Sequence, residues 1–153
     1  MIKQRVTFVV ACFCFAIAAP VHAAGGDPFA KVAEDADFMA GKKAIAEQNW
    51  KAAIGSFTRA TNKHREEPDV YNMLGYSYRK AGDLDNAFRH YNAALRLDAN
   101  HKAAHEYIGE AYLMKGDLPS AEKHLATLER LCGKDCEEYA DLSKSIAGFK
   151  AKK

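Results

Sequence analysis

Residues 68–101 read PDVYNMLGYSYRKAGDLDNAFRHYNAALRLDANH and decide the fold of this chain. The stretch holds two runs in which apolar side chains recur every three or four positions, and Gly82-Asp83 separates the runs. This spacing places side chains on one face of an α-helix. Glycine suits the left-handed residue that ends a helix, and aspartate accepts the free amide groups that begin the next one. The stretch therefore predicts two helices joined by a tight turn.

The same pattern is repeated, and three copies fall into register with a period of 34 residues. Two columns of the register never change: Gly41, Gly75 and Gly109 in the first run, and Ala53, Ala87 and Ala121 in the second. Five further columns hold mainly apolar residues, spaced to lie on one face of each helix. Small residues in fixed columns indicate that two helix backbones pass close together there. Three successive two-helix units predict an all-α fold.

The arrangement resembles the tetratricopeptide repeat family, whose two-helix units stack into a right-handed α-solenoid. The family motif runs aromatic, Leu-Gly, Tyr, Ala, aromatic, Ala, and the middle unit matches it best with Tyr71, Leu74-Gly75, Tyr78, Ala87, Tyr91 and Ala94. No single member of the family is identified. The resemblance implies repeats at 34–67, 68–101 and 102–135, and a C-terminal capping helix at 136–150 that continues the register. Residues 24–33 are left as an N-terminal extension.

Residues 1–23 have the layout of a secretory signal peptide. A basic start is followed by an uncharged apolar run at 6–19, and small residues precede a cleavage site between Ala23 and Ala24. The run is shorter than the roughly 20 apolar residues that a membrane span needs. We therefore expect a cleaved leader and an exported protein, most simply a bacterial periplasmic one. A retained N-terminal anchor and a lipoprotein attached at Cys12 are the alternatives.

The composition excludes several function classes. Apolar residues make up 48% of the chain and charged residues 27%, as in a globular protein. Lys and Arg total 22 against 20 Asp and Glu, and the leader holds two of the basic residues and no acidic one. A chain with balanced charge is not predicted to bind nucleic acid or an anionic membrane. Catalytic and phosphate-binding motifs are missing from the sequence, so no enzyme activity, cofactor or small-molecule substrate is predicted.

Two cysteines and two histidines carry the remaining chemical signals. Cys132 and Cys136 have three residues between them, and Gly133 among these allows the reversal that brings two sulfurs together. Export to an oxidising compartment favours a structural disulfide, with free thiols and a redox or metal role as alternatives. His101 and His105 are four apart, but no cysteine or carboxylate near them in sequence completes a metal site. No metal is predicted.

The resemblance also implies where a partner would bind. In the family, ligand contacts come from the first helix of each unit, which lines the concave face. Carried onto this chain, the partner-groove residues are Lys42, Asn72, Tyr76, Arg79, Lys80, Glu106, Tyr107 and Glu110. The basic and amide residues with which some members hold the acidic C-terminus of heat-shock chaperones are absent. Their positions hold Phe38, Lys42, Met73, Ala103 and Tyr107.

The sequence thus predicts a non-enzymatic adaptor of the bacterial cell envelope that binds a peptide or a partner protein in its groove. Tyr76 and Tyr107 are expected to anchor the partner, since tyrosine is enriched where binding energy concentrates. The first alternative is self-assembly through the weakly capped first repeat. The second, less favoured, is a metal-linked or redox-linked protein.

Overall fold

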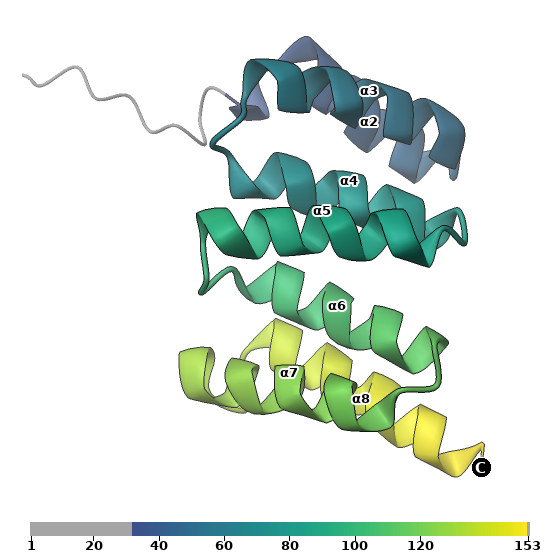
Figure 1. Ribbon diagram of the computed structural model, residues 1–153, viewed down its shortest axis with the longest axis vertical. Coiled ribbons are helices and arrows are strands. Elements are labelled where there is room, and N and C mark those ends of the chain that lie inside the picture. Colours follow the sequence, from purple (N-terminus) through teal and green to yellow (C-terminus); the bar gives the residue numbers. More distant parts are fainter. Residues whose placement is uncertain (1–31, 153) are drawn as a thin grey trace, which may run out of the picture.

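The protein is a stack of helices, seen in a computed structural model that describes residues 32–152. Its helices are α2 (Ala36–Ala46), α3 (Trp50–Lys63), α4 (Pro68–Lys80), α5 (Leu84–Leu97), α6 (Lys102–Met114), α7 (Leu118–Cys132) and α8 (Glu137–Ala151). The stack runs from α2 and α3 at one end to α7 and α8 at the other (Figure 1). Within the described residues there is no strand, and no helix is long and apolar enough to cross a membrane. The predicted all-α arrangement of three helix pairs and a capping helix is confirmed.

The turn inside each pair has one construction in all three units. A residue with positive φ ends the first helix: Gln48 at 55°, Gly82 at 87° and Gly116 at 79°. The next residue begins the second helix with a side-chain oxygen that accepts from a backbone amide three residues on, as Asn49, Asp83 and Asp117 do. This is the break that the sequence predicted, with the difference that Gln48 adopts the positive φ at a steric cost that glycine avoids.

The constant glycines are small for a reason that differs from the predicted one. A Cβ atom at Gly75 would lie 2.6 Å from Cδ1 of Tyr91, and one at Gly41 would lie equally close to the ring of Phe57. The neighbour is therefore an aromatic side chain of the second helix in the same unit, not a helix backbone. Tyr91 and Phe57 are fully buried, so their rings have no free space to move into.

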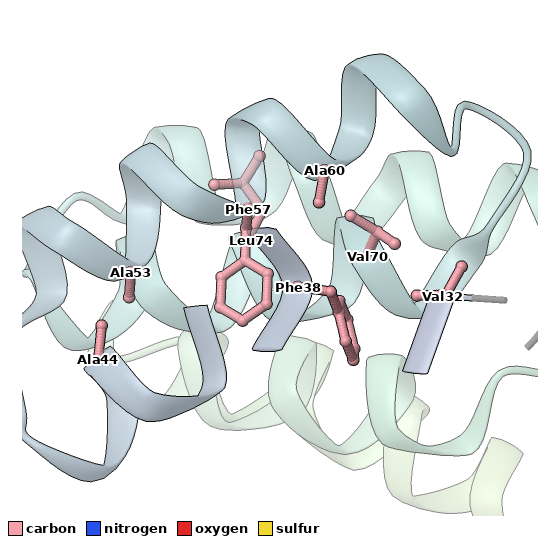
Figure 2. Close-up of a cluster of buried hydrophobic side chains, with 8 residues drawn as sticks. All are labelled: Val32, Phe38, Ala44, Ala53, Phe57, Ala60, Val70 and Leu74. Atoms are coloured by element: carbon pink, nitrogen blue, oxygen red, sulfur yellow. The ribbon is translucent and has the colours of Figure 1, made fainter. Parts of the chain in front are cut away.

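The first unit is held by an apolar cluster that Figure 2 shows. Its members are Val32, Phe38, Ala44, Ala53, Phe57, Ala60, Val70 and Leu74. Val32 is fully buried, although the sequence placed it in an extension without a pattern. Residues 24–31 of that extension lie outside the described residues, as do the predicted leader at 1–23 and its cleavage site between Ala23 and Ala24.

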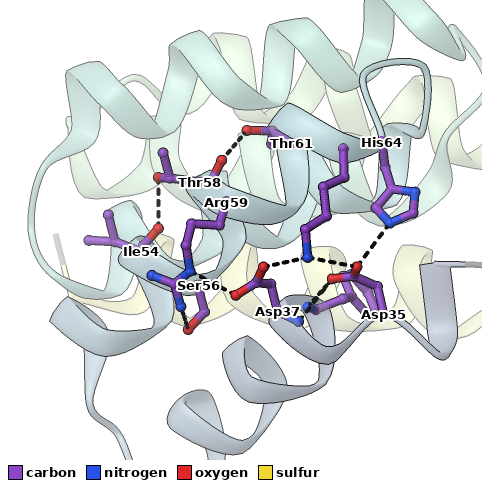
Figure 3. Close-up of polar contacts among 10 residues, drawn as sticks. Asp35, Asp37, Ile54, Ser56, Thr58, Arg59, Thr61 and His64 are labelled. Atoms are coloured by element: carbon purple, nitrogen blue, oxygen red, sulfur yellow. Dashed lines mark hydrogen bonds and ion pairs between the residues drawn. The ribbon is translucent and has the colours of Figure 1, made fainter.

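A polar network joins α2 to α3 beside this cluster (Figure 3). Asp37 Oδ1 accepts from Arg59 Nε at 2.7 Å, and Lys63 Nζ donates to Asp37 Oδ2 at 2.6 Å and to Asp35 Oδ2 at 3.2 Å. Partial burial raises the pKa of Asp35, but hydrogen bonds from a helix amide, Lys63 and His64 outweigh that effect and lower it to about 2. The start of α2 is thus fixed by charge as well as by apolar contact.

Helix α8 covers the far end of the stack. Its Leu142 and Ile146 are buried against Leu113, Ala121 and Leu128 of the third unit. A disulfide between Cys132 and Cys136 joins the last residue of α7 to the residue that precedes α8, with their Cα atoms 5.9 Å apart. A Cβ atom at Gly109 would lie 2.5 Å from Leu142 Cδ2, so in the third unit the constant glycine faces the capping helix.

Candidate partner-binding site

The first helices of the second and third units meet through two tyrosines. The rings of Tyr76 on α4 and Tyr107 on α6 have their centroids 5.1 Å apart. The guanidinium carbon of Arg79 lies 5.3 Å from each of these centroids, within the range of a cation–π contact. The two side chains that the sequence offered as free anchors for a partner are therefore already engaged with Arg79.

Arg79 is the centre of a buried network. Its Nε donates to the hydroxyl of Tyr91 at 3.2 Å, and its Nη1 lies 2.5 Å from Oε2 of Glu110. The other oxygen of Glu110 accepts from the Ser145 hydroxyl at 3.2 Å. Burial opposes the charge on Arg79, but Tyr91 and Glu110 more than compensate and its pKa rises. Side chains of α4, α5 and α6 thus meet at one guanidinium group, and Ser145 of α8 joins them through Glu110.

Glu106 lies one turn before Glu110 and has no such partner. It is only 8% exposed, and no hydrogen bond or ion pair engages its carboxyl group within residues 32–152. Burial raises the pKa of Glu106 to about 8, and the negative charges of Glu110, Asp141 and Glu138 add to the rise, which Arg79 only partly offsets. The sequence predicted Glu106 as part of the groove, but not that it would be buried.

Asn72 occupies the equivalent position on α4, 34 residues before Glu106. It is 2% exposed, and its Oδ1 has no hydrogen-bond partner. Buried polar atoms without a partner are uncommon in folded proteins. Two successive first helices therefore hold a buried polar residue at the same position in their units.

A cavity of about 640 Å³ opens between the first helices and the capping helix. We call it the α6–α8 groove. It is lined by Arg79, Glu110, Leu113, Met114, Asp141, Lys144, Ser145, Gly148, Phe149 and Lys152. Leu113, Met114 and Phe149 make part of its lining apolar, and Met114 is 55% exposed. Its volume lies in the range of protein ligand sites, and its lining combines apolar contacts with charges of both signs.

The predicted groove residues are only partly brought together. Arg79 and Glu110 line the α6–α8 groove, and the rings of Tyr76 and Tyr107 contact Arg79. Asn72 and Glu106 are buried and do not line the groove. Lys42 and Lys80 are exposed and do not line the groove. Lys80 Nζ lies 5.8 Å from the ring centroids of Trp50 and of Tyr76.

The contribution of α8 was missed, although the sequence carried the signal. The capping helix continues the register of the repeats, so the groove-facing positions apply to it as well. Extending them to 136–150 would have selected Asp141, Lys144 and Gly148, which line the groove. Helix α8, which corresponds to the first helix of a fourth unit, is thus part of the candidate site and also covers the end of the stack.

The histidines that suggested a metal site have separate partners. Nδ1 of His105 lies 2.9 Å from Nδ1 of His124, and its Nε2 lies 3.1 Å from the carbonyl oxygen of Ala99. His101 begins α6, and its Nε2 lies 3.3 Å from Asp69 Oδ1. The ring nitrogens of His101 and His105 therefore do not converge on one point.

One group in the described residues has metal-ligand spacing, namely Cys132, Cys136 and Glu138. Both sulfur atoms are bonded to each other in the structure. A disulfide sulfur is not the thiolate that binds zinc or other soft metals. In this oxidised form the group offers a single carboxylate, which is too little to hold an ion.

The chain matches a family model described as tetratricopeptide repeat over residues 38–101 and again over 72–135. It is 25% identical to the TPR repeat-containing thioredoxin TTL4 of Arabidopsis thaliana over 105 residues, 69% of this chain and 15% of that protein. The chain thus spans less than a sixth of the length of this curated relative.

Two solved structures share the fold. The TPR2B domain of yeast Sti1, in a pHsp70 complex, has a TM-score of 0.71, 16% identity, and coverage of 81% of this chain and 99% of that one. The type III secretion chaperone SycD of Yersinia enterocolitica, in complex with a peptide of the translocator YopD, has a TM-score of 0.67, 18% identity, and coverage of 83% and 95%. At these identities the likeness establishes the fold alone.

Proposed function

Since this chain belongs to the tetratricopeptide repeat family, we propose that it is a non-enzymatic interaction module whose groove docks a segment of a partner protein. The observation that carries the proposal is the α6–α8 groove, which is open, partly apolar and edged by charged side chains. A partner side chain can bury apolar surface against Leu113 and Met114 while polar groups at the edge fix its orientation. The Sti1 and SycD structures, each a complex of a related fold with another chain, support this use of the fold.

The rigid background of the groove suits docking. Arg79 is held by Tyr76, Tyr107, Tyr91 and Glu110, so the floor is ordered before a partner arrives. A preorganised surface loses less conformational entropy on binding than a flexible one. The groove therefore offers a fixed shape to a partner segment.

We further propose that the module works in the bacterial periplasm as an adaptor or scaffold. The support is the leader-like composition of residues 1–23 and the Cys132–Cys136 disulfide, which is favoured in an oxidising compartment. Removal of the leader between Ala23 and Ala24 would be seen directly as the N-terminal sequence of the protein purified from a periplasmic extract. An intact N-terminus at Met1 would contradict the proposal.

Site-specific photocrosslinking tests the groove as the docking surface. A benzophenone amino acid replaces Met114, which lines the groove and is 55% exposed, and in a matched control it replaces Leu97, which does not line it and is 43% exposed. Irradiation in living cells should join a partner to the Met114 variant alone, and mass spectrometry identifies the partner and the crosslinked peptide. Adducts from both positions, or from neither, would contradict the proposal.

Self-association is the second candidate function. Met39 on α2 is 51% exposed at the end of the stack, where a second copy could pack against it. One solved structure of the related SycD chaperone describes a dimer. Sedimentation analysis over a range of concentrations separates the candidates, because self-association requires a mass that rises with concentration. In that case Met39→Lys should restore the monomer.

A further inference from the structure

The two cysteines at the junction of α7 and α8 lie beside a carboxylate, that of Glu138. We infer that Cys132, Cys136 and Glu138 bind a zinc ion once the disulfide between the two cysteines is reduced. Each cysteine would supply a thiolate sulfur and Glu138 a carboxylate oxygen, with a water molecule in the remaining position. The site lies at the end of the stack and does not depend on a partner docked in the α6–α8 groove.

The ligand atoms of the three residues lie close enough to share one ion. The two sulfur atoms and a carboxylate oxygen of Glu138 are all within 4.8 Å of one another. Sulfur and oxygen ligands of a tetrahedral zinc ion are roughly 3–4 Å apart, given zinc–ligand bonds of about 2.0–2.3 Å. Sulfur atoms that are no longer bonded to each other move apart toward this separation through rotation of their side chains. Residues 32–152 contain no other group of histidine, cysteine and acidic side chains with such spacing.

The fold keeps both cysteines at one place without the bond. Cys132 is the last residue of α7, and Cys136 directly precedes α8. Gly133, with a φ of 78°, turns the chain between the two helices. Leu142 and Ile146 bury one face of α8 against the third unit. Reduction therefore loosens α8 but leaves both thiols at the same corner of the stack.

The kinds of ligand in the group favour zinc over other metals. Thiolate sulfur binds soft and borderline metals, whereas magnesium and calcium take oxygen ligands. Carboxylate oxygen is a common ligand of zinc, and copper(I) prefers sets made of sulfur alone. Two thiolates and a carboxylate also carry enough negative charge to neutralise a divalent cation. Zinc sites with three protein ligands keep their fourth position for water or for a ligand from another molecule.

An ion can reach the group, and the nearby lysines do not block it. All three candidate ligands are partly exposed, which gives the ion a path of entry. Lys134, between the cysteines, has its Nζ 3.3 Å from Oε1 of Glu129. Lys102 Nζ lies 3.7 Å from Oε1 of Glu138, in an ion pair between partly exposed side chains. Because such pairs contribute little free energy, zinc can displace Lys102 at small cost.

Formation of the site requires a dithiol as the reductant. A thiolate of the dithiol attacks one sulfur of the Cys132–Cys136 bond, and its second thiol completes the exchange. The dithiol becomes a disulfide and supplies both electrons, while this chain gains two thiols. Zinc then displaces the two thiol protons and is itself neither oxidised nor reduced.

A zinc titration of the purified full-length protein tests the inference. The protein is reduced with a phosphine under argon, mixed with zinc and freed of unbound ions by gel filtration, and elemental analysis gives the zinc bound per chain. The variant Cys132→Ser/Cys136→Ser controls for zinc bound elsewhere in the chain, Cys12 and Cys14 included. Reduced wild type should bind one zinc ion more per chain than this variant, and oxidised wild type should show no such difference.

Three further variants test the carboxylate ligand, with affinities compared by competition against a chromophoric chelator. Glu138→Gln should weaken zinc binding by at least about tenfold, since even the outer-shell partners of a metal contribute that much. Glu137→Gln removes the same charge from the exposed neighbour, which is not in the group, and should bind like the wild type. Lys102→Gln removes the ion-pair partner of Glu138 and should not weaken binding. Circular dichroism establishes that each variant is folded before titration.

Cobalt(II) in place of zinc reports the ligand atoms directly. Thiolate-bound cobalt absorbs strongly in the near ultraviolet, and this absorption should appear with the reduced wild type and not with the double serine variant. Its absence, or equal zinc binding by the reduced wild type and the double serine variant, would overturn the inference. An equal affinity of Glu138→Gln and the wild type would overturn the assigned ligand set, and equal zinc binding by the oxidised protein would overturn the requirement for reduction.

Discussion

Arg79 of α4 and Glu110 of α6 form an ion pair across two successive repeats, with 2.5 Å between Nη1 and Oε2. Their side chains are only 9% and 24% exposed, and the hydroxyl of Ser145 on α8 donates to the other oxygen of Glu110. The pair therefore ties the second unit, the third unit and the capping helix together at the base of the groove. Stability of the stack and shape of the candidate site depend on the same contact.

Removing one partner of this pair should destabilise the protein strongly. Glu110→Ala leaves the Arg79 charge buried without compensation, and we expect a loss of about 2–3 kcal/mol in the free energy of unfolding. This loss is smaller than the largest values for fully buried pairs because Glu110 is partly exposed. Urea denaturation measures the loss. The control Glu47→Ala breaks an exposed pair with Lys43 and should cost less than about 0.5 kcal/mol. Equal effects of the two variants would contradict the assigned role of Arg79.

A methyl group added at Gly75 should destabilise the protein, whereas one added at Gly148 should not. The new Cβ at position 75 would lie 2.6 Å from the buried ring of Tyr91, so Gly75→Ala should cost about 1–3 kcal/mol through overpacking. Gly148 lies within α8 with no atom in reach of its added Cβ. There alanine should stabilise by about 0.5–1 kcal/mol, because it favours the helix over the unfolded chain. Thermal and urea unfolding of both variants check the opposite signs.

The fold was accessible to sequence analysis because its determinants repeat. Every unit must place the same apolar face on its neighbour. The residues equivalent to Gly75 and to Ala87 therefore recur in each unit, at a period equal to the length of the structural unit. Turn chemistry at Gly82-Asp83 fixed the helix ends. The all-α prediction therefore needed only periodicity and helix caps, which are local properties.

The site was harder to predict because its properties arise between units. A column shows that Arg79 faces the groove, but its burial depends on Tyr107 and Glu110 of the next unit. In the same way, Gly109 faces Leu142 because α8 folds over the third unit. Contacts that are made in one unit and not repeated in the others leave no periodic signal.

Acid should destabilise the protein between about pH 6.5 and pH 4. Burial lowers the pKa of His124 to about 4, and the nearby His105 lowers it further. Burial also lowers the pKa of His105 itself. The unfolded chain, whose histidines titrate near pH 6.5, therefore binds protons more readily than the folded one. The stabilisation is complete above pH 6.5, and we expect about 1–2 kcal/mol of it to be lost as the pH falls through this range.

Urea unfolding at a series of pH values, compared with His124→Gln, measures this loss. The variant should show a weaker dependence in that window, and NMR titration of the imidazole protons should place the wild-type transition of His124 below pH 5. Asp35, with a pKa lowered to about 2, contributes only below about pH 4 and so does not confuse the comparison. A His124 titration near pH 6.5 would contradict the prediction.

The contribution of Glu106 to stability should depend on pH in the opposite direction to that of His124. Its pKa is raised by burial and by neighbouring carboxylates to about 8, so the folded protein holds this proton more tightly than the unfolded chain does. Its contribution to stability is complete below about pH 4.5 and is lost as the pH rises toward 8. Glu106→Gln keeps a neutral side chain, and its stability relative to the wild type should rise by about 2 kcal/mol over this range. A difference that is constant with pH would show that Glu106 is ionised throughout.

The Cys132–Cys136 disulfide should fasten α8 to the stack. The native protein should be lighter than its reduced form by two hydrogen atoms, which mass spectrometry under non-reducing conditions detects. Reduction removes a short covalent loop, and we expect a loss of about 2 kcal/mol in stability. Equal masses before and after reduction would contradict the bond.

The effect of reduction should also reach the groove. Asp141, Lys144 and Ser145 on α8 line the groove, and Ser145 bonds to Glu110, so loosening α8 should weaken binding of a partner captured at that surface. Hydrogen exchange should speed up in α8 and in the adjoining residues of α6, and remain unchanged in α2 and α3. A Cys132→Ser/Cys136→Ser variant controls for the reagent, because it should already exchange fast in α8 and should not respond to reductant. If α8 stays protected after reduction, its packing through Leu142 and Ile146 is sufficient to hold it, and the disulfide has no role in forming the site.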